Sequence, residues 1–84
     1  MITFILKKLS LPQQKNVVAS IGNFLASRYD GDTAISLYSF FNSYLEVTQD
    51  KISNSIVSVQ KVSKTEIKEN YSSNLELLKQ LNLH

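Results

Sequence analysis

Apolar residues are densest in the segment from residue 34 to residue 48, AISLYSFFNSYLEVT. At 100° per residue, its apolar side chains cover about half of the circumference of a helix, and polar side chains cover the rest. A helix with a single neighbour needs a narrower apolar stripe. The pattern therefore predicts a helix at the centre of a bundle or at a subunit interface.

Two other segments combine helical spacing with a recognisable helix start. Residues 10–13, Ser-Leu-Pro-Gln, offer an N-cap, a proline in the first turn and a capping-box glutamine, and they predict a helix that runs to about Arg28. Residues 63–66, Ser-Lys-Thr-Glu, are a second capping box. The helix predicted there carries one apolar face, formed by Ile67, Tyr71, Leu75, Leu78 and Leu81.

The clearest turn lies at residues 29–33, where Gly31 can adopt positive φ and Asp32 can cap a following helix. We expect the two long helices on either side to be antiparallel neighbours. Gly22 lies inside the first of them, where glycine costs about 0.8–1 kcal/mol relative to alanine. We interpret it as a point where a second helix approaches closely.

Residues 52–62 allow two interpretations. Ile52, Ile56 and Val59 have helical spacing, and residues 48–50 could cap such a helix. Residues 55–62 are also rich in β-branched side chains and could form a strand, paired with residues 2–6. The main prediction is an all-α fold, a single domain over residues 1–84 built as a small bundle of about four helices. The alternative is an α+β fold with residues 2–6 and 55–62 as strands.

The composition argues against catalysis. The 84 residues include no cysteine and one histidine, His84 at the C-terminus, so disulfides, thiolate chemistry and a well-placed imidazole base are not expected. The two glycines, Gly22 and Gly31, do not form a phosphate-binding loop. We expect a protein that is not an enzyme, with no cofactor and no bound metal.

The net charge of +2 and a single arginine give no strong indication of a polyanion partner. Three lysines at i, i+3 and i+7, namely Lys61, Lys64 and Lys68, would share one face of a helix. With Arg28 as an extra contact, this face suggests an alternative function, a small regulator that binds the phosphates of a nucleic acid.

The aromatic segment favours a different function. Tyrosine and phenylalanine are enriched in the cores of protein interfaces, so we expect a surface formed by Tyr38, Phe41, Tyr44 and Leu45. Leu37 and Phe40 would belong to the adjoining core. The first hypothesis is a non-enzymatic homodimer that binds another protein, as an inhibitor, adaptor, immunity-type protein or small assembly subunit would. The size and pattern are typical of small bacterial or phage proteins.

The N-terminus adds two expectations. Met1–Lys8 resembles no secretory signal, and no apolar run approaches the roughly 20 residues of a membrane span, so we expect a cytoplasmic protein without a transmembrane segment. A weaker alternative treats Met1–Leu9 as a membrane-surface contact, with Phe4, Ile5 and Leu6 inserted and Lys7 and Lys8 at lipid headgroups.

Overall fold

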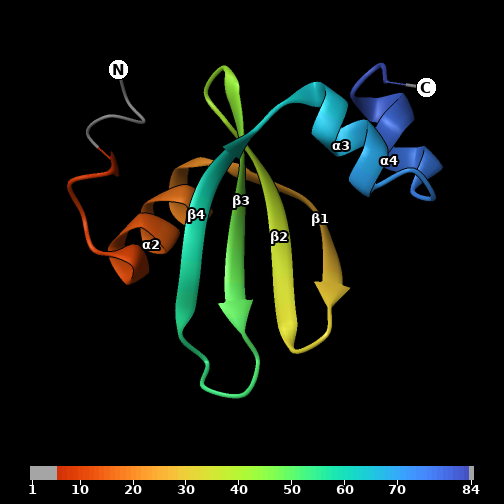
Figure 1. Ribbon diagram of the computed structural model, residues 1–84. Helices are drawn as coiled ribbons and strands as arrows, with labels where there is room; N and C mark the ends of the chain where they lie inside the picture. The colour runs from red at the N-terminus through yellow and green to blue at the C-terminus, as the bar shows by residue number, and fades with distance from the viewer. Residues whose placement is uncertain (1–5, 84) are drawn as a thin grey trace.

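A computed structural model describes residues 6–83, and it shows a four-stranded antiparallel sheet flanked by three helices (Figure 1). The strands follow one another in the sheet in their order along the chain. The elements are α2 (Leu11–Ile21), β1 (Asn23–Asp30), β2 (Thr33–Phe40), β3 (Ser43–Asp50), β4 (Ile56–Val62), α3 (Lys64–Asn70) and α4 (Leu75–Gln80).

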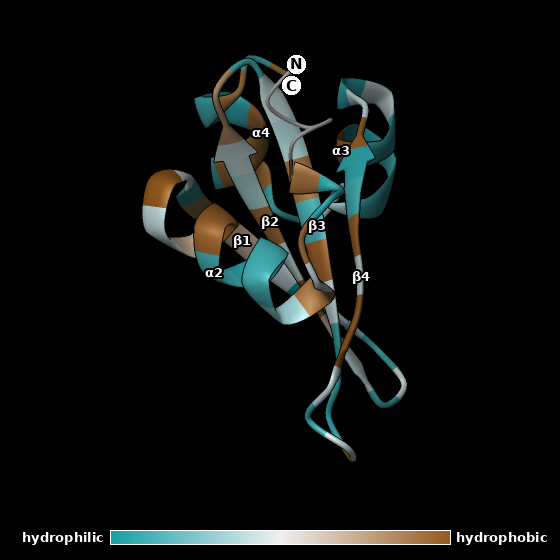
Figure 2. Ribbon diagram, turned by 90° about the vertical axis from the view of Figure 1, so that its left-hand side faces the viewer, coloured by the Kyte–Doolittle hydropathy of each residue, from teal (hydrophilic) through white to brown (hydrophobic). Residues whose placement is uncertain are grey.

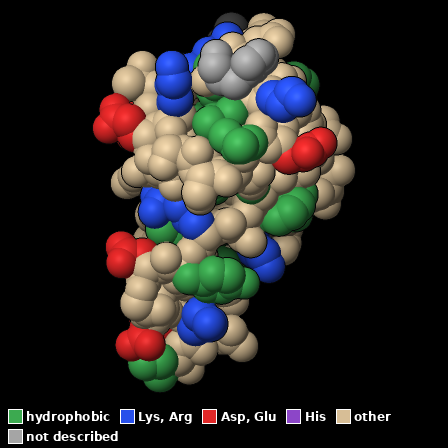
Figure 3. Space-filling model, turned by 90° about the vertical axis from the view of Figure 1, so that its right-hand side faces the viewer, with side chains coloured by type: hydrophobic (Ala, Val, Ile, Leu, Met, Phe, Trp, Pro, Cys, Tyr) green, Lys and Arg blue, Asp and Glu red, His purple; other side chains and the backbone are tan. Residues whose placement is uncertain are grey.

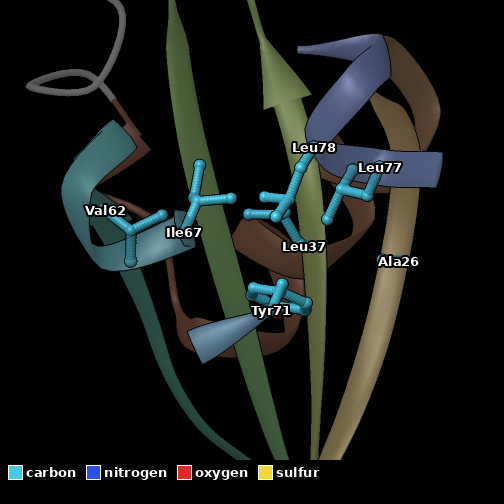
Figure 4. Packing of buried hydrophobic residues seen from close by; sticks show 7 residues of the cluster. All are labelled: Ala26, Leu37, Val62, Ile67, Tyr71, Leu77 and Leu78. Carbon is cyan, nitrogen blue, oxygen red and sulfur yellow. The ribbon is translucent and has the colours of Figure 1, made fainter. Parts of the chain in front are cut away.

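Helices cover both faces of the sheet. Helix α2 crosses one face (Figure 2) and buries Val18 against a cluster completed by Leu6, Phe40, Leu45 and Val47. Helices α3 and α4 cover part of the other face, where Figure 4 shows the second cluster, formed by Ala26, Leu37, Val62, Ile67, Tyr71, Leu77 and Leu78. Successive strand residues therefore contribute to two different cores, as the alternation of side chains along a strand requires.

Two tight hairpins join the first three strands. The pair Asp30 and Thr33 flanks a two-residue loop in which Gly31 has φ +59°, so the predicted turn and its positive φ are confirmed. The pair Phe40 and Ser43 flanks a second two-residue loop, and here the first loop residue is Phe41, with φ +56°. Short hairpin loops need positive φ at their first position, which is why glycine or asparagine usually occupies it.

The all-α bundle predicted from the sequence is wrong. Only 32% of the chain is helical, and residues 34–48 form most of β2 and β3 instead of one central helix. The physical reason is that β2 and β3 are the two inner strands and helices lie on both of their faces. Apolar residues therefore occur on both faces of these strands, and their sequence loses the clean alternation that marks a strand.

The helix expected over residues 52–62 is also wrong. Residues 51–55 form the loop after β3, where the Asp50 side chain accepts hydrogen bonds from the backbone N–H groups of Ile52 at 2.8 Å and Ser53 at 3.3 Å. Strand β4 lies within the 55–62 range of the alternative α+β prediction and pairs with β3. Residues 1–5 are outside the described residues, so the proposed strand over 2–6 and the membrane contact of Met1–Leu9 are not addressed by the structure.

Both predicted helix starts are confirmed, whereas both helix ends differ from the prediction. Ser10 and Ser63 each cap a helix in a complete capping box. Helix α2 ends at Ile21 rather than near Arg28, because residues 23–30 pair with β2. The C-terminal helix is divided into α3 and α4, and the Asn74 side chain starts α4 by accepting from the backbone of Leu77 at 3.1 Å.

Gly22 lies at the junction of α2 and β1, and its close neighbour is a strand rather than the predicted second helix. A Cβ atom at this position would lie 2.7 Å from the carbonyl oxygen of Ser39 and 2.7 Å from that of Val18. Because glycine has no Cβ atom, the end of α2 can lie directly against the backbone of β2.

Candidate protein-binding surface

The structure separates the four residues that the sequence analysis assigned to one interface. Leu45 is 2% exposed and belongs to the core beneath α2. Tyr38 is partly buried on the same face, whereas Tyr44 packs against the core beneath α3 and α4. Phe41 alone is strongly exposed, at 63%. The aromatic residues therefore do not form one continuous patch, and only Phe41 is presented as an interface residue would be.

Phe41 occupies the tip of the β2–β3 hairpin, which forms one end of the molecule (Figure 1). Its φ of +56° lies in the left-handed region, which costs a residue with a Cβ atom roughly 1–2 kcal/mol. The ring makes an edge-to-face contact with Phe40 at 4.9 Å between ring centroids, but it remains mostly open to solvent. Such an aromatic side chain in a strained turn is unfavourable both for the backbone and for solvation.

A surface hollow of about 260 Å³ lies beside Phe41. Its remaining wall is formed by Ser39, Asn42, Ser43, Tyr44 and Lys64. An exposed phenylalanine, a tyrosine and a lysine therefore border one concave, mixed apolar and polar surface. Interfaces between proteins are commonly organised this way, with an apolar anchor surrounded by polar groups.

The predicted lysine stripe does not lie on one helix face. Lys61 is in β4, whereas Lys64 and Lys68 are in α3. Arg28 projects from β1 toward the α3 side of the sheet, and its Nε lies 3.5 Å from Oε2 of Glu46. The premise of a continuous basic face for a phosphate backbone therefore does not hold in this fold.

Arg28 belongs to a polar network that the sequence analysis missed. The Tyr71 hydroxyl donates to Oε2 of Glu46 at 2.8 Å, and Arg28 Nε donates to the same oxygen at 3.5 Å. The guanidinium carbon of Arg28 lies 5.6 Å from the centroid of the Tyr71 ring. Glu46 is 9% exposed and Tyr71 4%. The network joins β1, β3 and the residue that ends α3, so it fastens the C-terminal helices to the sheet.

Electrostatics keep this network in one protonation state at neutral pH. Burial, followed by the hydrogen bond to Glu46 and the charge of Glu46, raises the pKa of Tyr71 well above its usual value, and Arg28 opposes this only partly. Burial alone would lower the pKa of Arg28, but attraction to Glu46 and favourable interactions with Tyr71 and Glu46 leave that pKa raised. Tyr71 therefore remains a neutral donor and Arg28 a cation, as expected of a structural tether.

The described residues show no arrangement typical of a metal site or of a membrane-spanning helix. Within residues 6–83, no three histidine, aspartate or glutamate side chains gather as metal ligands would. In the same range no helix is both long enough and apolar enough to cross a membrane. His84, the one histidine, lies outside the described residues.

Comparison with known proteins supplies no relative. The chain matches no protein-family model, no curated protein and no solved structure.

Proposed function

We propose that this chain acts by binding another protein through the tip of the β2–β3 hairpin, with Phe41 as the anchoring side chain. The observation that carries the proposal is the combination of 63% exposure and φ +56° at a phenylalanine. Glycine or asparagine would relieve the strain at this turn, and a polar side chain would relieve the exposure. Strained, exposed residues of this kind concentrate at functional positions.

The partner we infer is a protein with an apolar pocket for the phenyl ring and an acidic group near Lys64. Lys64 borders the same hollow as Phe41, so a carboxylate beside the partner's pocket would meet its ammonium group. Aromatic side chains that enter a partner's pocket commonly dominate the binding free energy. Inhibitors, adaptors and small assembly subunits all work by contacts of this type, without chemistry of their own.

The test compares two exposed apolar residues at opposite ends of the molecule. Phe41 lies at the tip of the β2–β3 hairpin, whereas Ile52, 78% exposed, lies in the loop between β3 and β4 at the far end of the sheet (Figure 1). Proteins captured from the cell of origin by the wild type, by Phe41→Gly and by Ile52→Ser are compared, and each captured protein is purified and titrated directly.

The proposal requires a partner that binds the wild type and Ile52→Ser equally and binds Phe41→Gly at least about thirtyfold more weakly, since an interface anchor contributes about 2 kcal/mol or more. Glycine suits the turn, so loss of binding would not reflect unfolding. Equal titration of every partner by all three proteins would refute the role of Phe41.

A further inference from the structure

Strand β1 is an exposed edge of the sheet. It is the terminal strand in the sheet order, and among the described residues it pairs only with β2. Edge strands of natural proteins usually carry lysine, proline or a covering element that blocks pairing with another chain. Strand β1, with sequence NFLASRYD, contains neither lysine nor proline, and its one arginine is drawn toward Glu46.

The other edge strand, β4, is better protected. It carries Lys61, and its pairing with β3 is irregular near Val57, whereas both edge strands have a helix packed on them. The lysine and the irregular pairing each discourage the addition of another strand. The asymmetry identifies β1 as the edge that is open to a partner.

The backbone of β1 directs hydrogen-bonding groups outward at alternate residues. In a hairpin with a two-residue loop, the flanking pair is hydrogen-bonded, so Asp30 and then Arg28 face β2. The N–H and C=O groups of Ser27 and Tyr29 therefore point away from the sheet. Ser27 is exposed, as a free edge requires.

Apolar side chains accompany this edge. Phe24 is 59% exposed and Tyr29 is 66% exposed. Figure 3, which views the molecule from the β1 side, shows hydrophobic side chains scattered among basic and acidic ones. Phe24 pairs with Tyr38, and Tyr29 pairs with Ala34. The register shift between Phe24 and Ala26 places Phe24 and Tyr29 on the same face of the sheet, the face that α2 crosses.

The sequence of β1 is complementary to a second copy of β1 that runs antiparallel to it. With a twofold axis at Ser27, and with Leu25 left out as the extra residue of the irregularity, Phe24 lies opposite Tyr29 of a second copy. The same register places Ala26 opposite Arg28 and Asn23 opposite Asp30. Both aromatic pairs lie on one face, no like charges are opposed, and cross-strand aromatic pairs stabilise antiparallel sheets.

We propose that two copies of this chain pair through β1, antiparallel about Ser27, so that their sheets join into one. This pairing deepens the proposed function. It rests on that function only because both treat the chain as a protein that acts by contacts with other proteins. It uses the side of the sheet rather than the β2–β3 hairpin, so either idea can fail without the other.

The first experiment measures solution mass by light scattering over a range of protein concentrations. The wild type is expected to approach the mass of two chains as concentration rises. Ser27→Lys is expected to remain a monomer, because two ammonium groups would face each other at the axis. Val57→Lys, which adds the same charge to the other edge strand, is the matched control and is expected to dimerise. A monomeric wild type, or a dimer unaffected by Ser27→Lys, would overturn the proposal.

The second experiment tests the register and does not depend on the stability of the lysine variant. Since the chain contains no cysteine, each introduced thiol is unique. Ser27→Cys is expected to form a disulfide-linked dimer on mild oxidation, whereas Ser55→Cys, in an exposed loop, is not. Phe24→Cys and Tyr29→Cys are expected to form a disulfide-linked dimer when mixed and to form no disulfide cross-link when oxidised separately. Cross-linking of Ser55→Cys as fast as Ser27→Cys, or no preference for the mixture, would refute the twofold register.

Discussion

Tyr71→Phe is expected to loosen the attachment of the C-terminal helices to the sheet while leaving their packing intact. The substitution removes only the hydroxyl that donates to Glu46 at 2.8 Å, and the ring keeps its place among the apolar residues of the cluster. Glu46, 9% exposed, is then left with Arg28, whose Nε is 3.5 Å away and at the limit of a hydrogen bond.

The magnitude follows from the charge and burial of the acceptor. A hydrogen bond to a charged group contributes about 1.5–3 kcal/mol. The side chains of Arg28 and Glu46 retain 29% and 12% exposure, so solvent compensates part of the loss, and we expect the lower half of that range. For a domain of this size each kcal/mol corresponds to roughly 4–8 °C in Tm, which makes the change clearly measurable.

The assay is urea denaturation of Tyr71→Phe, Glu46→Gln and the double variant. Because the two groups bond directly, the double variant is expected to be more stable than the sum of the single changes implies, by about 0.5–3 kcal/mol. Tyr29→Phe removes the hydroxyl of a tyrosine that is 66% exposed, and is expected to change stability by less than about 0.5 kcal/mol. If Tyr71→Phe behaves like Tyr29→Phe, the network does not hold the helices in place.

The remaining predictions concern pH, the α2–β1 junction and the hairpin tip. The pKa of Tyr71 is raised in the folded protein, so the unfolded chain releases the tyrosine proton first, near pH ~10. The free energy of unfolding should therefore fall as the pH rises beyond that value, by up to about 1.4 kcal/mol per pH unit from this residue. Urea denaturation between about pH 9 and about pH 11 should show a shallower fall for Tyr71→Phe than for Tyr29→Phe, and identical slopes would contradict the assignment. Gly22→Leu should lower the free energy of unfolding by at least about 1–3 kcal/mol, because its Cβ would lie 2.7 Å from two carbonyl oxygens; a neutral result in urea denaturation would remove the close approach. Phe41→Gly should leave the free energy of unfolding unchanged or raise it by about 1 kcal/mol. A clear fall in that free energy, measured by thermal denaturation, would show that the ring stabilises the fold rather than binds a partner.

Local signals could be predicted from the sequence because they depend on neighbouring residues. Ser10 with Gln13, and Ser63 with Glu66, form their capping boxes within one helical turn. Gly31 adopts positive φ where a turn was expected. The element after Gly31 was nevertheless wrong, since the same residue suits a helix C-terminus and a hairpin loop.

The two inner strands of the sheet, β2 and β3, could not be predicted for two physical reasons. Leu37 packs toward α3 and α4, whereas Phe40 packs toward α2, so both faces of β2 are apolar. The hairpin that separates β2 from β3 contains no glycine, because Phe41 takes the positive φ. Without alternation, and without a glycine in the loop, two strands and a loop matched a helical period.

The candidate site could be predicted only in part from the sequence. Phe41 belonged to the predicted interface, but Tyr38 and Tyr44 face opposite sides of the sheet once they lie on strands. The bonds of Glu46 to Arg28 and Tyr71 join residues 18 and 25 positions apart, and no sequence spacing indicates such pairs. The exposed edge of β1 likewise depends on the order of strands in the sheet.

The two proposed surfaces have a joint geometric consequence. Strands β1 of two copies would run antiparallel, so the β2–β3 hairpins of the copies would lie at opposite ends of the joined sheet. Each Phe41 would remain exposed, and two partner molecules could bind without contact between them. A dimer of this kind should therefore bind two partners with equal affinity, and Ser27→Lys should yield a monomer that binds one partner with the affinity of each site in the dimer. Sedimentation of the purified complexes measures the stoichiometry. A dimer that binds a single partner would place one of the two surfaces elsewhere.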